Sequence, residues 1–218
     1  MNVHRTEHLT DPGADLIDRA QSLWNRYGRI VMIAAGVVVV GGALAFTLQS
    51  RDRAEQAASE KLADANALFW QGDYKRSEDM AKTVAQQWPS SPSGIDARRL
   101  TGDNAYWTND FKTAITEYKA YLAKSNTGVL ADGVRRSLAY ALESDKQYAE
   151  AATAYTQLVG KFDRESSGEF LAAAARCQAA ANTKPEAVKT LQRLLDEFGE
   201  TSFANAARID IAELSAAR

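Results

Sequence analysis

The feature that most constrains this chain is an uncharged apolar segment near the N-terminus, residues 30–48. At a rise of about 1.5 Å per residue, a helix of this length extends about 28 Å, close to the ~30 Å hydrocarbon core of a bilayer. A buried helix of a soluble protein would keep a polar stripe, and this segment has none. We therefore predict that residues 30–48 form a transmembrane helix.

Two other interpretations of this segment fit the sequence less well. The valine run at residues 37–40 is typical of a buried strand, but the rest of the sequence supplies no strand to pair with it. Ala43, Leu44 and Ala45 imitate a signal-peptide cleavage site. However, the apolar run is longer than in most signal peptides, and acidic residues precede it instead of a short basic region. These residues are Glu7, Asp11, Asp15 and Asp18. We therefore expect an uncleaved anchor.

Residues 15–29, just before the apolar segment, have an amphipathic pattern. Their apolar side chains share one face of a helix, and they are Leu16, Ile17, Ala20, Leu23, Trp24 and Tyr27. This juxtamembrane segment either lies along the membrane interface, where Trp24 and Tyr27 are favourable, or extends the spanning helix inward. Gly28 would be the natural break between an interfacial and a spanning helix.

The residues that flank the apolar segment do not orient it. Arg19, Arg26 and Arg29 precede the segment, and Arg51, Arg53 and Lys61 follow it. The positive-inside rule compares the basic residues on the two sides, and here they balance. Within the segment, Gly41 and Ala45 form one pair of small residues four apart, which could seat a partner helix.

Beyond Arg51 the sequence repeats at an interval of 37 residues. Three aromatic residues at this spacing, Tyr74, Phe111 and Tyr148, each follow a turn-like segment such as Gly72-Asp73. A small residue comes three positions after each aromatic: Ser77, Ala114 and Ala151. A fourth unit has a slightly shorter turn and places Ala187 at the position of these small residues, with Leu191 four residues later. A period of this length indicates a solenoid of stacked helical hairpins.

These features predict an all-α chain in which one transmembrane helix precedes a right-handed solenoid of about four hairpins. We expect a mobile arm at residues 1–14, a connecting helix at 49–57, the repeat domain at 58–201 and a capping helix at 202–218. The repeat units are expected at 58–94, 95–131, 132–167 and 168–201. The capping helix should pack through Phe203, Ala206, Ala207, Ile209 and Leu214.

The repeats resemble the tetratricopeptide repeat. That family has a small residue in the first helix, an aromatic residue after a Gly-Asp-type turn, a small residue three positions later and often a closing proline. Tyr74, Ser77 and Pro89 belong to the unit that matches best. The later units lack the proline, and the spacing of 37 exceeds the family's usual 34. The resemblance implies the fold, whereas repeats of this kind serve many partners.

The order of parts is similar to that of the YfgM-like family, ancillary subunits of the bacterial protein-translocation channel. The resemblance rests on the short arm, the segment 24–29 before the apolar run, the single spanning helix and a repeat domain of this size. It implies an inner-membrane protein with a cytoplasmic N-terminus and a periplasmic repeat domain. It also implies association with the translocation channel and periplasmic chaperones.

Several classes of function are disfavoured. The 26 basic and 28 acidic residues are interspersed, so nothing predicts nucleic-acid binding. His4 and His8 alone make an incomplete metal site, and no serine or cysteine in the repeat domain has a histidine to activate it. Cys177 lies among alanines and is expected to be a small buried hydrophobe. We expect no enzyme activity, no cofactor and no small-molecule substrate.

The register of the repeats predicts the binding surface. In the tetratricopeptide fold the first helices line the concave face, which the resemblance assigns to Asn66 and Phe69, to Arg99, Asp103 and Tyr106, to Arg136 and Tyr140, and to Arg176. Trp70 and Trp107 recur at the ends of first helices. Aromatic and arginine side chains commonly anchor protein interfaces. The pair Arg98-Arg99 returns as Arg135-Arg136, which predicts a basic ladder for carboxylates. Alternatively, the arginines pair with Asp96, Asp103 and Asp132, and the tryptophans pack between hairpins.

Two functions remain open, and both take other proteins and the lipid bilayer as partners. In the first, the chain is a chaperone-like adaptor that transiently binds exported polypeptides or assembly factors near the translocation channel. In the second, it is a constitutive structural subunit of another large membrane complex. Its spanning helix would then pack within that complex, and its repeats would clamp the extrinsic parts.

Overall fold

The computed structural model describes residues 12–216, and over that range the chain is all-helical, as predicted. Its helices are α1 (Pro12–Trp70), α2 (Tyr74–Gln87), α3 (Pro92–Trp107), α4 (Phe111–Leu122), α5 (Val129–Ser144), α6 (Tyr148–Leu158), α7 (Arg164–Ala180), α8 (Lys184–Phe198) and α9 (Ala204–Ala216). The mobile arm expected at residues 1–14, with its two histidines, lies largely outside the described residues.

The chain divides into two compact units, residues 1–53 and 54–218. In the first unit, α1 continues through Gly28, so the backbone shows no helix break at that position. The indole ring of Trp24 lies over this glycine, where an added Cβ would come 3.3 Å from the ring. The juxtamembrane residues therefore extend the same helix, as one of the two sequence interpretations had it.

Within the described residues, α1 contains the one stretch that is long and apolar enough to cross a membrane. Side chains from Ile30 to Leu48 are exposed, including Val38 and Phe46, which have more than two thirds of their surface free. A signal sequence near the N-terminus has the same length and composition. The structure thus identifies α1 as a candidate membrane anchor or signal segment.

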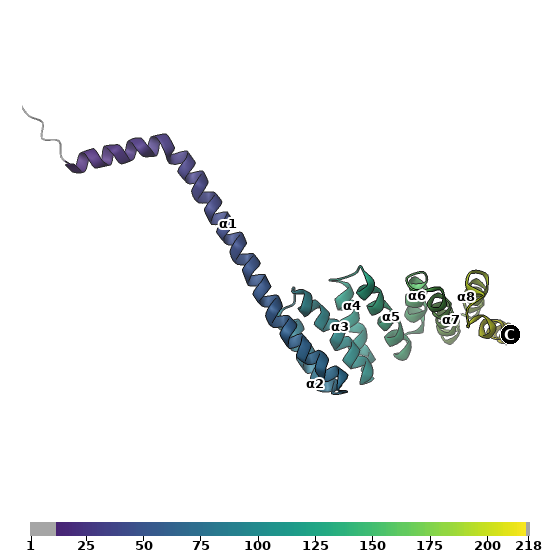
Figure 1. Cartoon of the computed structure of the whole chain (residues 1–218). Helices are drawn as coiled ribbons and strands as arrows, with labels where there is room; N and C mark the ends of the chain where they lie inside the picture. Colours follow the sequence, from purple (N-terminus) through teal and green to yellow (C-terminus); the bar gives the residue numbers. More distant parts are fainter. Residues whose placement is uncertain (1–11, 217–218) are drawn as a thin grey trace, which may run out of the picture. The chain divides into compact units, whose positions relative to one another are not determined.

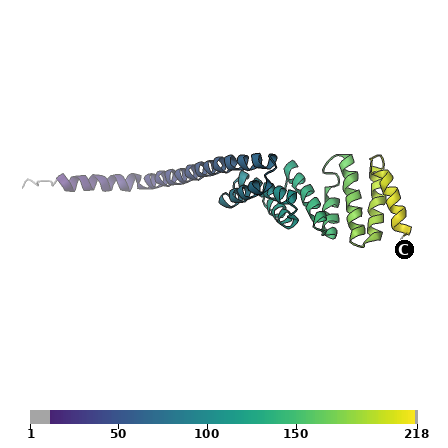
Figure 2. The same ribbon diagram turned by 90° about the horizontal axis from the view of Figure 1, so that it is seen from below.

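The second unit is a stack of antiparallel helical hairpins, which run from blue to yellow in Figure 1 and are seen from below in Figure 2. The end of α1 pairs with α2, and the following hairpins are α3–α4, α5–α6 and α7–α8. Each of these hairpins packs on its neighbours in chain order, and α9 packs mainly on α8.

A residue in the left-handed region of backbone space closes each hairpin turn. These residues are Gly72, Asn109, Lys146 and Asn182, with φ between 60° and 81°. Each follows the end of a first helix. Glycine and asparagine adopt this conformation at little cost, which accounts for three of the four turns, whereas Lys146 adopts it without that preference. Asp73 and Asp110 then cap α2 and α4, because each side chain accepts a hydrogen bond from the backbone N–H group three residues later. The repeated turn therefore has a backbone cause that is visible in the sequence.

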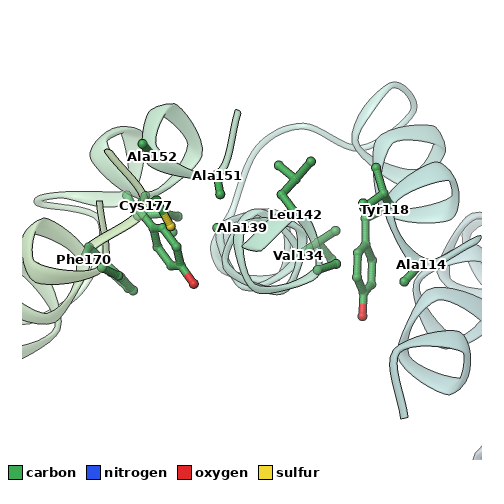
Figure 3. Packing of buried hydrophobic residues seen from close by; sticks show 14 of the residues in the cluster. Ala114, Tyr118, Val134, Ala139, Leu142, Ala151, Ala152, Phe170 and Cys177 are labelled. Carbon is green, nitrogen blue, oxygen red and sulfur yellow. The ribbon is translucent and has the colours of Figure 1, made fainter. Parts of the chain in front are cut away.

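The hairpins are held by buried apolar clusters in which small and large side chains meet. In the central cluster, Val134 and Leu142 of α5 lie between the α4 side chains Ala114 and Tyr118 and the α6 residues Ala151 and Ala152 (Figure 3). Separate clusters join α1, α2 and α3 at one end and α7, α8 and α9 at the other.

The capping helix differs in detail from the expected packing. Ala207 is buried, and Phe203 and Leu214 pack on the terminal cluster. Ala206 is exposed, and Ile209 has 60% of its surface free. Since α9 has no helix on its far side among the described residues, only one narrow face of it is covered. The expectation that Ala206 and Ile209 are packed was wrong.

The close approach of α3 and α4 predicts opposite effects for two glycine substitutions. In Gly102→Ala the new Cβ would lie 2.6 Å from the ring of Tyr118, which is buried, so the free energy of unfolding should fall by about 1–2 kcal/mol. In Gly133→Ala, on α5, the new Cβ meets open space, so that free energy should rise by about 0.5–1 kcal/mol. Urea unfolding followed by circular dichroism measures both. Stabilisation by both substitutions would contradict the tight contact.

Candidate functional site

The first helices bring four of the predicted binding residues around one cavity. Asp103, Tyr106 and Trp107 come from the second half of α3, and Tyr140 comes from α5. The cavity has a volume of about 160 Å³ and is also lined by Tyr118 and Ser137. We refer to these six residues as the aromatic cavity. It lies between two successive hairpins, because α3 and α5 contact each other directly.

Tyr118 and Ser137 are lining residues that the sequence did not single out. Tyr118 belongs to α4, a second helix, and so lies outside the first-helix residues predicted to bind partners. Its ring is 1% exposed, yet its hydroxyl reaches the carboxylate of Asp103. The recurrence of tyrosine at positions 118 and 155, one repeat apart, was the available signal, because a buried tyrosine hydroxyl needs a partner. Ser137 carries no comparable signal.

A carboxylate network forms one wall of the aromatic cavity. Arg99 donates to Asp103 at 2.7 Å and makes two bonds to Asp96 at 2.6 and 2.9 Å. Tyr118 donates its O–H to the other oxygen of Asp103 at 2.8 Å. Burial raises the pKa of Asp103, although Arg99 and Tyr118 both favour its charged form. Burial and the nearby Asp103 likewise raise the pKa of Tyr118.

A second network of the same chemistry lies one hairpin further along. Glu143 accepts two bonds from Arg176, at 2.8 and 3.0 Å, and one from the hydroxyl of Tyr155 at 2.6 Å. Burial opposes ionisation of Glu143, but these hydrogen bonds outweigh it and lower its pKa. Arg176, a predicted binding residue, is therefore held by a carboxylate of the preceding hairpin.

The arginines do not form a free basic ladder. Arg98 pairs with Glu117 at 3.1 Å and Arg135 with Asp132 at 2.8 Å, in addition to the pairs of Arg99 and Arg176. Arg136 is exposed and lies over the ring of Phe162, with its guanidinium carbon 5.3 Å from the ring centre. Most of the positive charge on this face is compensated within the chain. This agrees with the alternative interpretation of the sequence, in which the arginines pair with nearby carboxylates.

The aromatic residues at the ends of the first helices form a connected row. Trp70 and Phe69 meet edge to face, Phe69 also contacts Tyr74, and Tyr74 stacks on Trp107 with 5.8 Å between ring centres. Trp107 is 59% exposed and Trp70 is 82% exposed. Trp107 thus contacts the preceding hairpin and still presents surface to solvent. Trp70 is not packed between hairpins.

Two other predicted residues have local roles. Asn66 is half-buried, and its side-chain amide donates to the backbone carbonyl of Leu62 in α1 at 2.9 Å. Tyr140 donates its hydroxyl to Glu169 of the next hairpin at 3.2 Å. The structure therefore gathers Asp103, Tyr106, Trp107 and Tyr140 and leaves Asn66, Arg136 and Arg176 outside the aromatic cavity.

Comparison with known proteins matches this geometry to a repeat family. Residues 173–201, which cover the second half of α7 and all of α8, match the family model of the tetratricopeptide repeat. The hairpin stack is similar to that of a tetratricopeptide repeat protein from Parabacteroides merdae, with a TM-score of 0.61 and 14% identity over 74% of this chain and 61% of that chain. The repeat domain is a tetratricopeptide-repeat solenoid.

Other solved structures have a similar fold. The nearly identical TPR-like repeats of a Podospora anserina protein assigned as a kinesin light chain give a TM-score of 0.56 and 15% identity, covering 73% of this chain and 86% of that chain. The Pseudomonas aeruginosa pilF structure gives 0.50 and 16%, covering 76% and 69%. No curated protein matches the sequence. At these identities the similarity shows the fold alone.

The tetratricopeptide fold typically serves as a non-catalytic scaffold for protein interaction. Among the described residues, no group of three or more histidine, cysteine, aspartate or glutamate side chains could hold a metal ion. Cys177 is buried, and burial raises the pKa of its thiol to about 12, so it stays protonated near neutral pH. The chemistry of this face is that of recognition by aromatic and charged side chains.

The second network predicts a pH dependence of tetratricopeptide-domain stability. Because the folded pKa of Glu143 lies below the ordinary value for a glutamate, 4.5, its stabilising contribution is complete above that pH and is lost as the pH falls through the folded value. Glu143→Gln should lower the free energy of unfolding by about 1 kcal/mol at neutral pH. Below pH 4.5, the difference in the free energy of unfolding between this variant and the unmodified chain should become smaller. Urea titrations at several pH values measure it.

The matched control is Glu150→Gln, which removes a carboxylate from a surface ion pair with Lys119. Both side chains of that pair are more than half exposed, so the change should stay within about 0.5 kcal/mol at all pH values. Equal losses for the two variants would show that Glu143 contributes no more than a surface pair.

Proposed function

We propose that this chain is a membrane-anchored adaptor that binds other proteins through the first-helix face of its tetratricopeptide domain. The observation that carries the proposal is the aromatic cavity, where Trp107, Tyr106 and Tyr140 surround a space that no side chain of the described residues fills. Tyrosine and tryptophan side chains in such concave sites supply most of the energy in many protein interfaces. Proteins with this repeat fold generally mediate protein–protein interaction.

The aromatic row supports a binding role for the same end of the first helices. Burying the exposed surface of an aromatic ring of this size stabilises a complex by roughly 1–3 kcal/mol, and Trp70 is 82% exposed. Its neighbour Phe69 and the stacked pair of Tyr74 and Trp107 hold the row in place. A rigid aromatic surface loses little side-chain entropy on binding, which favours affinity.

We further propose that residues 30–48 anchor the chain in a bilayer. Their exposed apolar side chains would be satisfied by lipid, and Trp24, Tyr27 and Arg29 would lie near the interface. Gly41 has open space around the position of a Cβ, so this part of α1, with Ala45, would admit a neighbouring helix. The resemblance in layout to YfgM-like subunits supports an inner-membrane location and a periplasmic repeat domain. Translocation-channel subunits or chaperones would be the partners.

The adaptor role predicts that partner recovery depends on the aromatic cavity. When the full chain is purified in mild detergent, it should retain partner proteins. Trp107→Ala should lower the recovered amount of these proteins at least about fivefold, because truncating an anchoring aromatic residue typically costs more than 1 kcal/mol. Ser137→Arg, which places a long side chain in the cavity without removing an aromatic, should have the same effect. Quantitative mass spectrometry of the retained proteins measures both.

The control for this experiment is Val129→Ala, which removes an exposed apolar side chain, 88% free, away from the cavity. Recovery that is unchanged in Trp107→Ala and Ser137→Arg would refute binding at this site. A stable complex at fixed stoichiometry, lacking translocation-channel components and insensitive to both variants, would instead favour a constitutive subunit of another complex.

The proposed topology predicts protection from external protease. In a bacterium with two membranes, external protease should cleave the repeat domain once the outer membrane is opened and the inner membrane is still intact. A cytoplasmic marker should stay intact under the same conditions. A tag placed at residue 1 should resist cleavage until the inner membrane is breached. Digestion of the repeat domain only after that breach would overturn the periplasmic placement.

A further inference from the structure

A second hollow lies at the C-terminal end of the repeat domain, between α7, α8 and α9. It has a volume of about 410 Å³ and shares no lining residue with the aromatic cavity. Its α7 wall is made of Ala172, Ala175 and Ala179, which lie on one face of that helix. We call this hollow the terminal trough. Its lining is mainly apolar, so water in it gains few hydrogen bonds.

The base of the terminal trough carries a smaller side chain than the equivalent position of the two preceding hairpins. Tyr118 and Tyr155 occupy the same position in their second helices, and each reaches a carboxylate on its first helix. The equivalent residue in α8 is Leu191, which is shorter and has no hydroxyl. It is 1% exposed and forms the base of the trough. This position of the last hairpin therefore has neither the ring nor the hydroxyl of the two preceding hairpins.

The α9 wall combines apolar and acidic side chains. Phe203 and Leu214 are half-buried and line the trough together with the exposed Ala206. Asp210 and Glu213 follow on the same face, three residues apart, and both are exposed. Neither carboxylate makes an ion pair or hydrogen bond within the described part of the chain. The rim of the trough on this side therefore carries two uncompensated negative charges.

The basic residue on the opposite rim does not balance these charges. Arg176 lines the trough from α7, but both of its bonds go to Glu143. With that pair neutral overall, Asp210 and Glu213 leave the rim net negative. A bound partner that placed a carboxylate here would be repelled, and a lysine or arginine would be attracted.

We propose that the terminal trough binds a segment of a partner protein that inserts an apolar side chain over Leu191 and sets a lysine or arginine against Asp210 and Glu213. This inference rests on the proposed adaptor function and names the chemistry of the partner. The apolar side chain supplies most of the affinity, because exposed ion pairs contribute little by themselves. The two carboxylates select basic over acidic segments and accelerate association.

The test uses the full chain in nanodiscs of phosphatidylcholine, which has no net charge, with empty nanodiscs as the blank. The probe is a short fluorescein-labelled peptide in which leucine and phenylalanine are flanked by lysines. Fluorescence anisotropy should show saturable binding. A peptide with glutamate in place of every lysine, and one with serine in place of both apolar residues, should each bind at least about tenfold more weakly, a change of about 1.4 kcal/mol.

Two variants of the chain locate the binding. Asp210→Lys with Glu213→Lys reverses the rim charge, and Ala206→Trp fills the trough from an exposed position. Each should weaken binding of the lysine peptide at least about tenfold. The control is Glu60→Lys with Asp64→Lys, which makes the same change of net charge on exposed residues of α1. Its affinity for the lysine peptide should stay within about twofold of that of the unmodified chain.

Several outcomes would overturn the proposal. These are no binding of the lysine peptide, equal binding of the glutamate peptide, or equal loss in the control pair. A second copy of the chain as the occupant would appear in light scattering as a dimer that Ala206→Trp dissociates, and this too would overturn it. If Trp107→Ala still abolishes recovery of natural partners while the trough fails these tests, the adaptor function stands and the trough has no part in it.

Discussion

The close crossing of the two helices within each hairpin is the constraint on which the rest of the repeat domain depends. At Gly102 the approach leaves no space for a Cβ, because the ring of Tyr118 occupies it. This contact carries the tyrosine hydroxyl across to Asp103 on the first helix, and Tyr155 reaches Glu143 in the next hairpin. Packing of a ring against a small residue therefore decides which carboxylates are buried and where they lie.

The distribution of charge on the first-helix face follows from that packing. A buried carboxylate needs a cation, and Arg99 and Arg176 are committed to Asp103 and Glu143. What this face offers a partner is thus mainly aromatic surface, together with the free acidic rim of α9. In the last hairpin Leu191 replaces the tyrosine, so no hydroxyl reaches the first helix from this position, and Leu191 lines the terminal trough.

The candidate site could be predicted in part from the sequence. The 37-residue register correctly brought Asp103, Tyr106, Trp107 and Tyr140 to one region, because residues at equivalent positions of stacked repeats share a face. It did not show that Arg98 pairs with Glu117, and it left open whether Arg135 pairs with Asp132. Ion pairing depends on side-chain direction over a few ångströms, which a helical register does not specify.

The sequence by itself determined the helical class, the repeat period and the apolar segment at residues 30–48, because turn chemistry and hydrophobic length are local properties. Residues such as Gly72 and Asn109 adopt the left-handed turn conformation whatever packs around them. Only the tertiary structure decided that Tyr118 borders a cavity, that Ile209 is left exposed, and that the alanines of α7 open a trough beside Asp210. These outcomes depend on volume and charge contributed by different helices, and space between helices exists only once they have packed.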